Sequence, residues 1–257
     1  MSNYPTLRLV IGISNKDIDD YLLVCESFGF IRCETIEDIT IAINHERNAI
    51  YGDVSLVTFA GRKSILQLFK DKANIEGIII AQPAEYCSYN NILDDLIKSF
   101  QTPLYEEGFN NIGVFYPDDT DKLYGHWSNW IKSVMDYNQF NSHHKYTLGE
   151  HCLRCKMGCE SYNGVFKDEL IIASALHDVG KPYTQTFDEN GEAHYHHHTN
   201  IGAYNCLFYD CDNADKLIIS QIISNHTDLK RVQNLSDNST IYNLVKYLYE
   251  IDMRNIS

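Results

Sequence analysis

The chain lacks the features that would place it in a membrane or outside the cell. No run of apolar residues approaches the roughly 18 that a membrane-spanning helix needs. The N-terminal residues 1–8 lack the basic and then apolar pattern of a signal peptide. Its eight Cys are spread along a chain rich in core-forming residues, which is typical of reduced thiols rather than of a disulfide framework. We therefore expect a cytoplasmic protein with no membrane partner.

A basic stripe or a cluster of Lys and Arg is also missing. The formal net charge is −14, because 21 Lys and Arg stand against 35 Asp and Glu. A protein that holds a long duplex by its phosphates needs clustered positive charge. The sequence therefore argues against extended duplex binding. A small nucleotide or the end of an oligonucleotide, held through metal ions, is compatible with this charge.

The pattern of apolar residues along the chain changes near residues 117–121. A length of 257 residues is sufficient for two domains. Before this point, short apolar runs alternate with helical patterns, and four runs are expected to be buried strands: residues 7–13, 54–59, 77–81 and 112–116. Such alternation predicts βαβ units around a mainly parallel sheet. After it no segment is typical of a strand. We predict an α/β domain over residues 1–121 and an all-α domain over residues 122–257.

Two adjacent side chains that can bind a metal, His177 and Asp178, end an apolar helix-like segment just before a Gly and Pro break. Neighbouring positions on a helix point about 100° apart. At a helix end, however, an imidazole and a carboxylate can converge on one cation. An ionised Asp beside an apolar run is costly to bury unless it is paired or metal-bound. For an isolated pair, a helix end and a core His would be the simpler interpretation.

The pair is not isolated, because four more residues of these types lie in or at the end of segments with helix-like apolar spacing: His151, His198, His226 and Asp252. A helical bundle builds a metal site in this way, from side chains of several facing helices. The order His, His-Asp, His, His, Asp resembles the HD-domain superfamily of metal-dependent phosphohydrolases over residues 124–257. Such a fold would be all helical.

This resemblance implies a ligand set. The first metal site would be formed by four residues: His151, His177, Asp178 and Asp252. Asp178 would bridge to a second ion held by His198 and His226. Many members of the superfamily keep only the first four ligands, so the expected cofactor is one or two divalent transition metals. Imidazole and carboxylate together suit Mn²⁺, Fe²⁺, Co²⁺, Ni²⁺ or Zn²⁺, and the sequence does not choose among them.

Lys181 and His144 are candidates for contact with the substrate. The resemblance implies that Lys181 can orient the leaving phosphate, which makes it a catalytic candidate beside Asp178. Its alternative role is that of a Lys that interacts with the C-terminal end of a helix dipole. His144 precedes the first ligand helix and could contact a phosphate or a sugar, or simply belong to the helix entry.

Four His residues lie close together before the third predicted ligand helix. His198 is taken as the metal ligand because it leads directly into that helix. The other three are expected in a loop over the site, where His197 is a candidate substrate contact.

A stripe of three Cys, at positions 152, 155 and 159, has spacing that can bind zinc. A closed zinc site needs four ligands, and the chain has no fourth ligand residue at a matching spacing. Free Cys is among the most buried residue types, so we expect core packing here.

The N-terminal half resembles a P-loop kinase of the polynucleotide-kinase type, through residues 9–14, 52–63 and 100–109. A working phosphate loop needs Gly-x-x-x-x-Gly-Lys-Ser/Thr. After Gly12 the second Gly and the Ser/Thr are missing, and three Asp stand where anions would bind. We therefore predict a degenerate kinase-like domain that binds no ATP, although Lys16 gripping a nucleotide is the alternative. Three other basic residues are expected on the surface: Arg62, Lys63 and Lys98.

These observations favour a metal-dependent phosphohydrolase, acting as a phosphomonoesterase or a phosphodiesterase on a nucleotide or on a phosphate at a nucleic-acid end. One alternative is cleavage of a pyrophosphate linkage in a dinucleoside polyphosphate or an alarmone. Another is an inactive protein that senses a nucleotide or binds a partner, and the intact ligand set argues against it. The sequence does not indicate an oligomeric state.

Overall fold

The computed structural model describes residues 4–83, 91–142 and 144–255. The chain divides into two compact units, residues 1–120 and 121–257, and each is described by itself. Among the helices in these described ranges, none is long and apolar enough to span a bilayer.

A five-stranded, fully parallel sheet forms the centre of the N-terminal unit, in the order β2-β3-β1-β4-β5. Its strands are β1 (Thr6–Ile11), β2 (Ile31–Arg32), β3 (Ala49–Gly52), β4 (Asn74–Ile80) and β5 (Asn111–Phe115). The apolar side chains of β1 and β4 are buried, apart from the half-buried Ile78, as expected for central parallel strands. The expected α/β unit with a parallel sheet is therefore confirmed.

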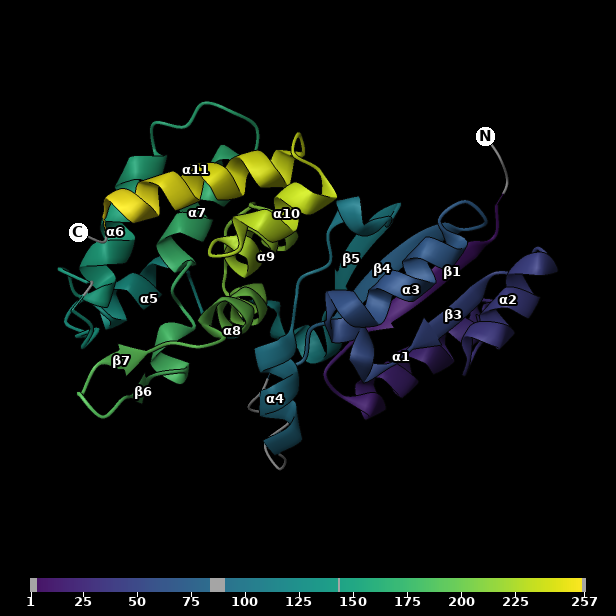
Figure 1. Ribbon diagram of the computed structural model, residues 1–257. Coiled ribbons are helices and arrows are strands. Elements are labelled where there is room, and N and C mark those ends of the chain that lie inside the picture. Colours follow the sequence, from purple (N-terminus) through teal and green to yellow (C-terminus); the bar gives the residue numbers. More distant parts are fainter. Residues whose placement is uncertain (1–3, 84–90, 143, 256–257) are drawn as a thin grey trace. The chain divides into compact units, whose positions relative to one another are not determined.

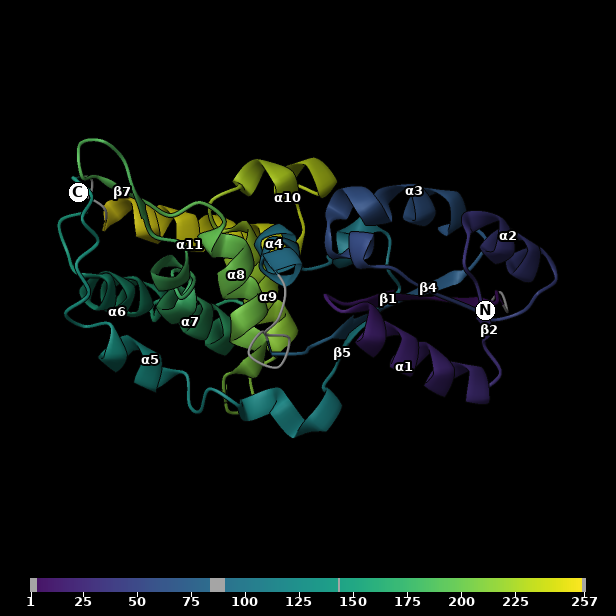
Figure 2. The same ribbon diagram turned by 90° about the horizontal axis from the view of Figure 1, so that it is seen from below.

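Helices cover both faces of this sheet. They are α1 (Asn15–Ser27), α2 (Ile36–Asn44), α3 (Phe59–Phe69) and α4 (Asn91–Ser99), with 3-10 turns η1 (Val54–Val57), η3 (Tyr105–Glu107) and η4 (Pro117–Lys122). Figure 2 shows α1 on one face and α2 and α3 on the other. The turn after β1 leads into α1, where the Ser14 side chain accepts from the backbone N–H of Asp17. The likeness to P-loop kinases stays a prediction.

Residues 54–59 were expected to form a strand, and this expectation is wrong. The strand β3 ends before them, at Gly52, and η1 and the start of α3 occupy the segment. Two side chains cap these turns: Asp53 accepts from the Ser55 N–H at 2.8 Å, and Thr58 accepts from the Gly61 N–H at 3.0 Å. Such local caps stabilise helical turns over an extended run.

The expectation that Arg62 lies on the surface is also wrong. Arg62 and Glu107 are both fully buried, and the guanidinium donates two hydrogen bonds to the carboxylate at 2.8 and 2.9 Å. A third guanidinium N–H donates to the carbonyl oxygen of Leu56. Such a paired charge is tolerated in the core because its hydrogen bonds are satisfied, whereas Lys63 is exposed.

The C-terminal unit is built from helices: α5 (Ser128–Ser133), α6 (Leu148–Cys159), α7 (Lys167–Leu176), α8 (His198–Asn205), α9 (Lys216–Asn225), α10 (Leu229–Leu235) and α11 (Thr240–Arg254), with η5 (Lys181–Tyr183) and η6 (Cys206–Phe208). Helix α9 is buried from Leu217 to Asn225. Helices α7 and α8 pack against it, and α11 contacts α6, α7 and α9 (Figure 1). The expected helical architecture is confirmed in its main lines.

A short antiparallel hairpin interrupts these helices, although no strand was expected in this half. It pairs β6 (Thr186–Phe187) with β7 (Ala193–His194). Gly191, with a φ of 77°, lies in the connection, where the left-handed conformation favours glycine. Strands of two residues are too short for an alternating pattern to indicate them.

Candidate metal centre

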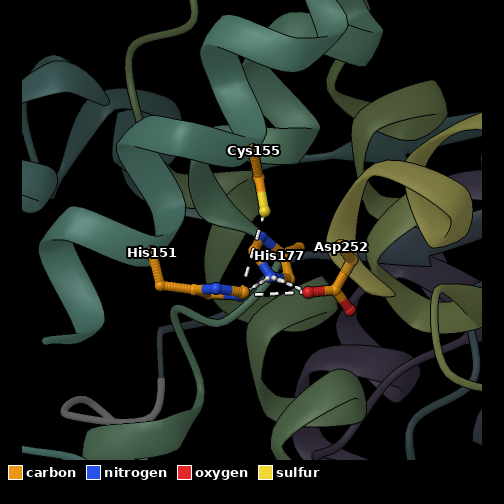
Figure 3. A group of neighbouring side chains, drawn as sticks. All are labelled: His151, Cys155, His177 and Asp252. Carbon is orange, nitrogen blue, oxygen red and sulfur yellow. Dashed lines mark hydrogen bonds and ion pairs between the residues drawn. The ribbon is translucent and has the colours of Figure 1, made fainter. Parts of the chain in front are cut away.

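Helix α6 carries the first of the candidate ligands. The helix begins at a capping box, in which Thr147 and Glu150 each bond the backbone N–H of the other. This start places His151 one turn into the helix, where its side chain is 1% exposed. The buried imidazole faces inward toward α7 and α11 (Figure 3).

His177 and Asp178 follow the last residue of α7, which is Leu176. The chain turns there through hydrogen bonds from Val179 N–H to the Leu176 carbonyl and from Lys181 N–H to the Asp178 carbonyl, both at 2.9 Å. This turn brings two sequence neighbours onto the same centre, so that His177 Nε2 lies 3.3 Å from Asp178 Oδ2. The expectation that a helix end lets the pair converge fits this geometry.

Three of the imidazoles are oriented in the same way. The Nδ1 atoms of His177, His198 and His226 each lie 2.7–2.8 Å from the carbonyl oxygen of the residue three positions earlier. A carbonyl only accepts, so Nδ1 carries the proton and donates it. This leaves Nε2 facing the centre, which is how metal-binding His residues are commonly held.

Four donor atoms from α6, the end of α7 and α11 form the first group. The Nε2 of His151 lies 3.1 Å from the Nε2 of His177, 3.0 Å from Oδ1 of Asp252 and 3.5 Å from Oδ2 of Asp178. The Nε2 of His177 lies 3.7 Å from the same oxygen of Asp252. Figure 3 shows three of these side chains pointing toward one another.

The other oxygen of Asp178 faces a second group. Its Oδ1 lies 3.4 Å from Nε2 of His198 and 3.9 Å from Nε2 of His226. The two oxygens of one buried carboxylate are thus divided between two sets of donors. The structure brings together all six residues that the resemblance implied as ligands.

The charge states of these groups follow from burial and from their neighbours. Burial lowers the pKa of His226 to about 3 and also lowers that of His198. Burial opposes ionisation of Asp178, but Lys181 and His177 outweigh it and hold the pKa of this carboxyl well below its ordinary value. Burial likewise opposes ionisation of Asp252, yet the hydrogen bond to His151 and the charge of His177 lower its pKa to about 2.

His177 is the exception among the imidazoles. Burial lowers its pKa, but the charge of Asp178 and the hydrogen bond to it prevail and raise the pKa to about 8. The two carboxylates thus attract one proton to the centre. A bound cation would displace that proton, because metal ligands bind in their deprotonated form.

The residues present fit a divalent cation. Acceptor atoms of two imidazoles and two carboxylates crowd within 3.0–3.7 Å of one another in the pairs given above. Two ligand atoms each about 2.1 Å from one ion are separated by about 3.0–3.4 Å in octahedral or tetrahedral coordination. Imidazole with carboxylate suits a transition metal.

Lys181 lies beside the ligands, almost buried, at 5% exposure. Its ammonium donates to Oδ2 of Asp178 and to Oε1 of Gln139, each at 2.8 Å. It also lies 3.5 Å from Nε2 of His144. Burial, followed by the charge of Lys181, lowers the pKa of His144 to about 4, so this imidazole is neutral near pH 7.

A cavity of about 280 Å³ adjoins the donors, and Asp178 and Asp252 form part of its wall. Lys181 and His144, both expected near the substrate, line it as well. His197 does not: it is exposed, has a left-handed φ of 66°, and is not among the lining residues. Its neighbours on either side, His196 and His198, line the cavity instead.

Two residues that hold Lys181, Gln139 and Tyr195, are not indicated by any pattern in the sequence. Gln139 accepts from its ammonium, and the Tyr195 hydroxyl donates to the backbone carbonyl of Gln139 at 2.5 Å. The Tyr195 ring also lies 5.3 Å from the Lys181 Nζ. Neither residue belongs to a spacing pattern, because one precedes α6 and the other lies in the loop before α8.

All three Cys of the stripe on α6 are buried, with 0% exposure each, as core packing predicts. The thiol of Cys155, however, lies 3.9 Å from Nε2 of His151. Burial raises the pKa of Cys155.

Gly180 permits the close approach that brings His198 to Asp178. A Cβ at Gly180 would lie 2.0 Å from the carbonyl oxygen of His198 and 2.9 Å from the backbone nitrogen of Gly202. We expect Gly180→Ala to displace the start of α8 and to lower the free energy of unfolding by about 1–3 kcal/mol. Urea unfolding and metal counting would show lower stability and a weakened second group. Gly113→Ala, whose Cβ would meet only a side-chain carbon at 3.4 Å, is the control.

Comparison with known proteins agrees with this site. Residues 148–253 match the family model of the HD domain, and all six candidate ligands lie within the match. The chain is also similar to a bifunctional uridylyltransferase/uridylyl-removing enzyme of Bradyrhizobium diazoefficiens, 22% identical over 73% of this chain and 21% of that protein. A protein of the same description from Nitrobacter hamburgensis is 24% identical over 70% of this chain and 20% of its own length.

These comparisons define the class of the C-terminal unit. It carries an HD domain, the domain of a family of metal-dependent phosphohydrolases. The resemblance predicted from the order of His and Asp residues is confirmed at this level. The chain spans about a fifth of the length of the curated relatives it matches.

Proposed function

We propose that the C-terminal unit hydrolyses a phosphodiester of a nucleotide or of a nucleic-acid end at the centre formed by the two donor groups. His151, His177, Asp178 and Asp252 would hold one divalent ion, and Asp178, His198 and His226 a second. When bound, such ions supply Lewis acidity to a phosphoryl oxygen and make a nucleophile available from water at neutral pH. The observation that carries the proposal is the division of the two Asp178 oxygens between the groups.

The side chains around the cavity have separate roles in this proposal. The ammonium of Lys181, fixed by Gln139 and Asp178, would stabilise negative charge on the phosphoryl group or on the leaving oxygen. The neutral imidazole of His144 can donate a hydrogen bond to substrate or accept one from it. Because Lys181 is already hydrogen-bonded on two sides, it is oriented before the substrate arrives.

The description of the curated relatives favours a diester over a monoester. The curated relatives are described as uridylyl-removing, and removal of a uridylyl group from an oxygen cleaves a phosphodiester.

A substrate panel tests this proposal. The full chain would be stripped with a chelator, reloaded separately with Mn²⁺, Fe²⁺, Co²⁺, Ni²⁺ or Zn²⁺, and assayed on matched compounds. These are the p-nitrophenyl ester of uridine 5′-monophosphate, uridine 5′-monophosphate, a 2′,3′-cyclic nucleotide, a cyclic dinucleotide and a dinucleoside polyphosphate. We expect metal-dependent turnover that is highest on a phosphodiester.

Two other results would change the assignment. Preference for the monophosphate would make the protein a nucleotidase, and preference for the polyphosphate would make it a pyrophosphate-linkage hydrolase. No turnover of any compound by metal-loaded protein would contradict the proposal and favour a role in binding alone.

A further inference from the structure

The thiol of Cys155 lies close to the donor atoms of the first group. Cys155 lies four residues after His151 on α6, so both side chains share one helix face. Its Sγ lies 3.9 Å from Nε2 of His151. Ligand atoms of His151, Cys155, His177 and Asp252 all lie within 4.8 Å of one another. Figure 3 shows the sulfur directed toward the other three side chains.

The separation between Cys155 and His151 allows one ion to bind both side chains. Zinc bonds are about 2.3 Å to sulfur and about 2.0–2.2 Å to nitrogen and oxygen. Two ligands of one ion are therefore never more than about 4.5 Å apart. The 3.9 Å between the Cys155 sulfur and the His151 nitrogen meets this limit.

We propose that Cys155 is a ligand of the first metal ion, which gives the centre a thiolate besides imidazole and carboxylate. On binding, the thiol releases its proton to solvent and the sulfur forms a bond to the ion, with no change of oxidation state. The inference rests on the proposed function only in requiring an ion at this place. It extends that function to the choice of metal.

The consequence is selection of a thiophilic ion. Thiolate ligands favour soft or borderline metals, whereas carboxylate and water suit Mn²⁺ and Mg²⁺. A set with one sulfur and two imidazole nitrogens is therefore expected to prefer Zn²⁺, Co²⁺ or Fe²⁺ to Mn²⁺. Loss of the sulfur is expected to weaken Zn²⁺ binding more than Mn²⁺ binding.

The absorption spectrum of the Co²⁺-loaded protein detects a metal–sulfur bond directly. A Co²⁺–thiolate bond gives an intense near-ultraviolet charge-transfer band that nitrogen and oxygen ligands do not give. The full chain, stripped of metal, would be titrated with Co²⁺ while the bound metal is counted by elemental analysis. We expect the band to rise with the first equivalent in the wild type. Cys155→Ser and Cys155→Ala should lose it, whether or not they still hold the ion.

Two further variants complete the experiment. Cys159→Ser alters an equally buried thiol on the same helix and should keep the band. Cys152, whose sulfur lies within 4.8 Å of ligand atoms of His177 and Asp178, is the rival ligand, and Cys152→Ser should also keep the band. A wild type that binds Co²⁺ without the band overturns the inference, as does a band that persists in Cys155→Ser or disappears in Cys152→Ser alone. A wild type that binds no Co²⁺, Zn²⁺ or Mn²⁺ overturns the metal centre itself and with it the proposed function.

Discussion

Asp178→Asn is expected to abolish metal binding at both groups and to reduce hydrolysis by at least about 100-fold. Loss of a residue that only hydrogen-bonds a metal ligand typically lowers metal affinity or activity by about 10–100-fold. Asp178 faces both groups directly through its two oxygens, so a larger effect is expected. The amide retains the shape of the carboxylate but not its charge. Elemental analysis and the assay on the preferred phosphodiester would measure the two losses.

The same substitution leaves the ammonium of Lys181 without its ionic partner in a buried place, 2.8 Å from the altered group. Breaking such a pair by changing one member costs about 3–5 kcal/mol. The double variant Asp178→Asn with Lys181→Met removes both charges and should recover stability but not metal or activity. Asp168→Asn changes an exposed acid in the first turn of α7 and should alter neither stability nor metal binding and activity. Full activity in folded Asp178→Asn would refute the assigned centre.

His226→Ala is expected to lower the metal content from two ions per chain to one. His226 presents Nε2 to Oδ1 of Asp178 at 3.9 Å, and its Nδ1 is held by the carbonyl of Ile223. Removing it leaves His198 and Asp178 as the remaining donors of the second group, which is too few to retain an ion against solvent. Turnover should also fall steeply, because the chain would lose the Lewis acidity that an ion held by His198, His226 and Asp178 would supply.

Elemental analysis of the folded His226→Ala variant distinguishes a metal-binding role of His226 from a packing role. A His that only packs would cost stability, on the order of 1–3 kcal/mol, without altering the metal count. The control is His126→Ala, since His126 bonds Ser128 and Asp212 and belongs to neither donor group. One ion per chain in the wild type, or two in His226→Ala, would show that the second group binds no metal.

Much of the centre could be predicted because each candidate ligand has a local signature. His177 and Asp178 end an apolar helix, and His198 begins one, so their positions follow from helix boundaries that the sequence indicates. Their order then matched the HD domain. What the order could not supply was the turn after α7 that lets adjacent residues face one centre.

Cys155 and Gln139 show what the sequence could not reveal. The Cys spacing on α6 indicates no fourth ligand in step, whereas the group around Cys155 combines His151 of the same helix with His177 and Asp252 from other parts of the chain. Gln139 bonds Lys181 from a position 42 residues away, outside any helix. Contacts of this kind depend on tertiary packing and have no periodic pattern in the chain.

In the N-terminal unit two expectations were wrong, for different reasons. Residues 54–59 have the composition of a buried strand, yet the caps at Asp53 and Thr58 favour helical turns. The sequence favours a surface position for Arg62, because a charged residue is rarely buried without a partner. Its partner, Glu107, lies 45 residues further on and could not be paired with it from spacing alone.

Anomalous diffraction from a crystal loaded with Co²⁺ or Zn²⁺ tests the central claim most directly, because it locates the metal without relying on activity. We expect an anomalous peak within about 2.0–2.2 Å of Nε2 of His151 and His177 and of carboxylate oxygens of Asp178 and Asp252. A second peak is expected beside His198 and His226, on the other oxygen of Asp178. A loaded, folded protein with no peak at these donors, or with its metal bound elsewhere, would contradict the account.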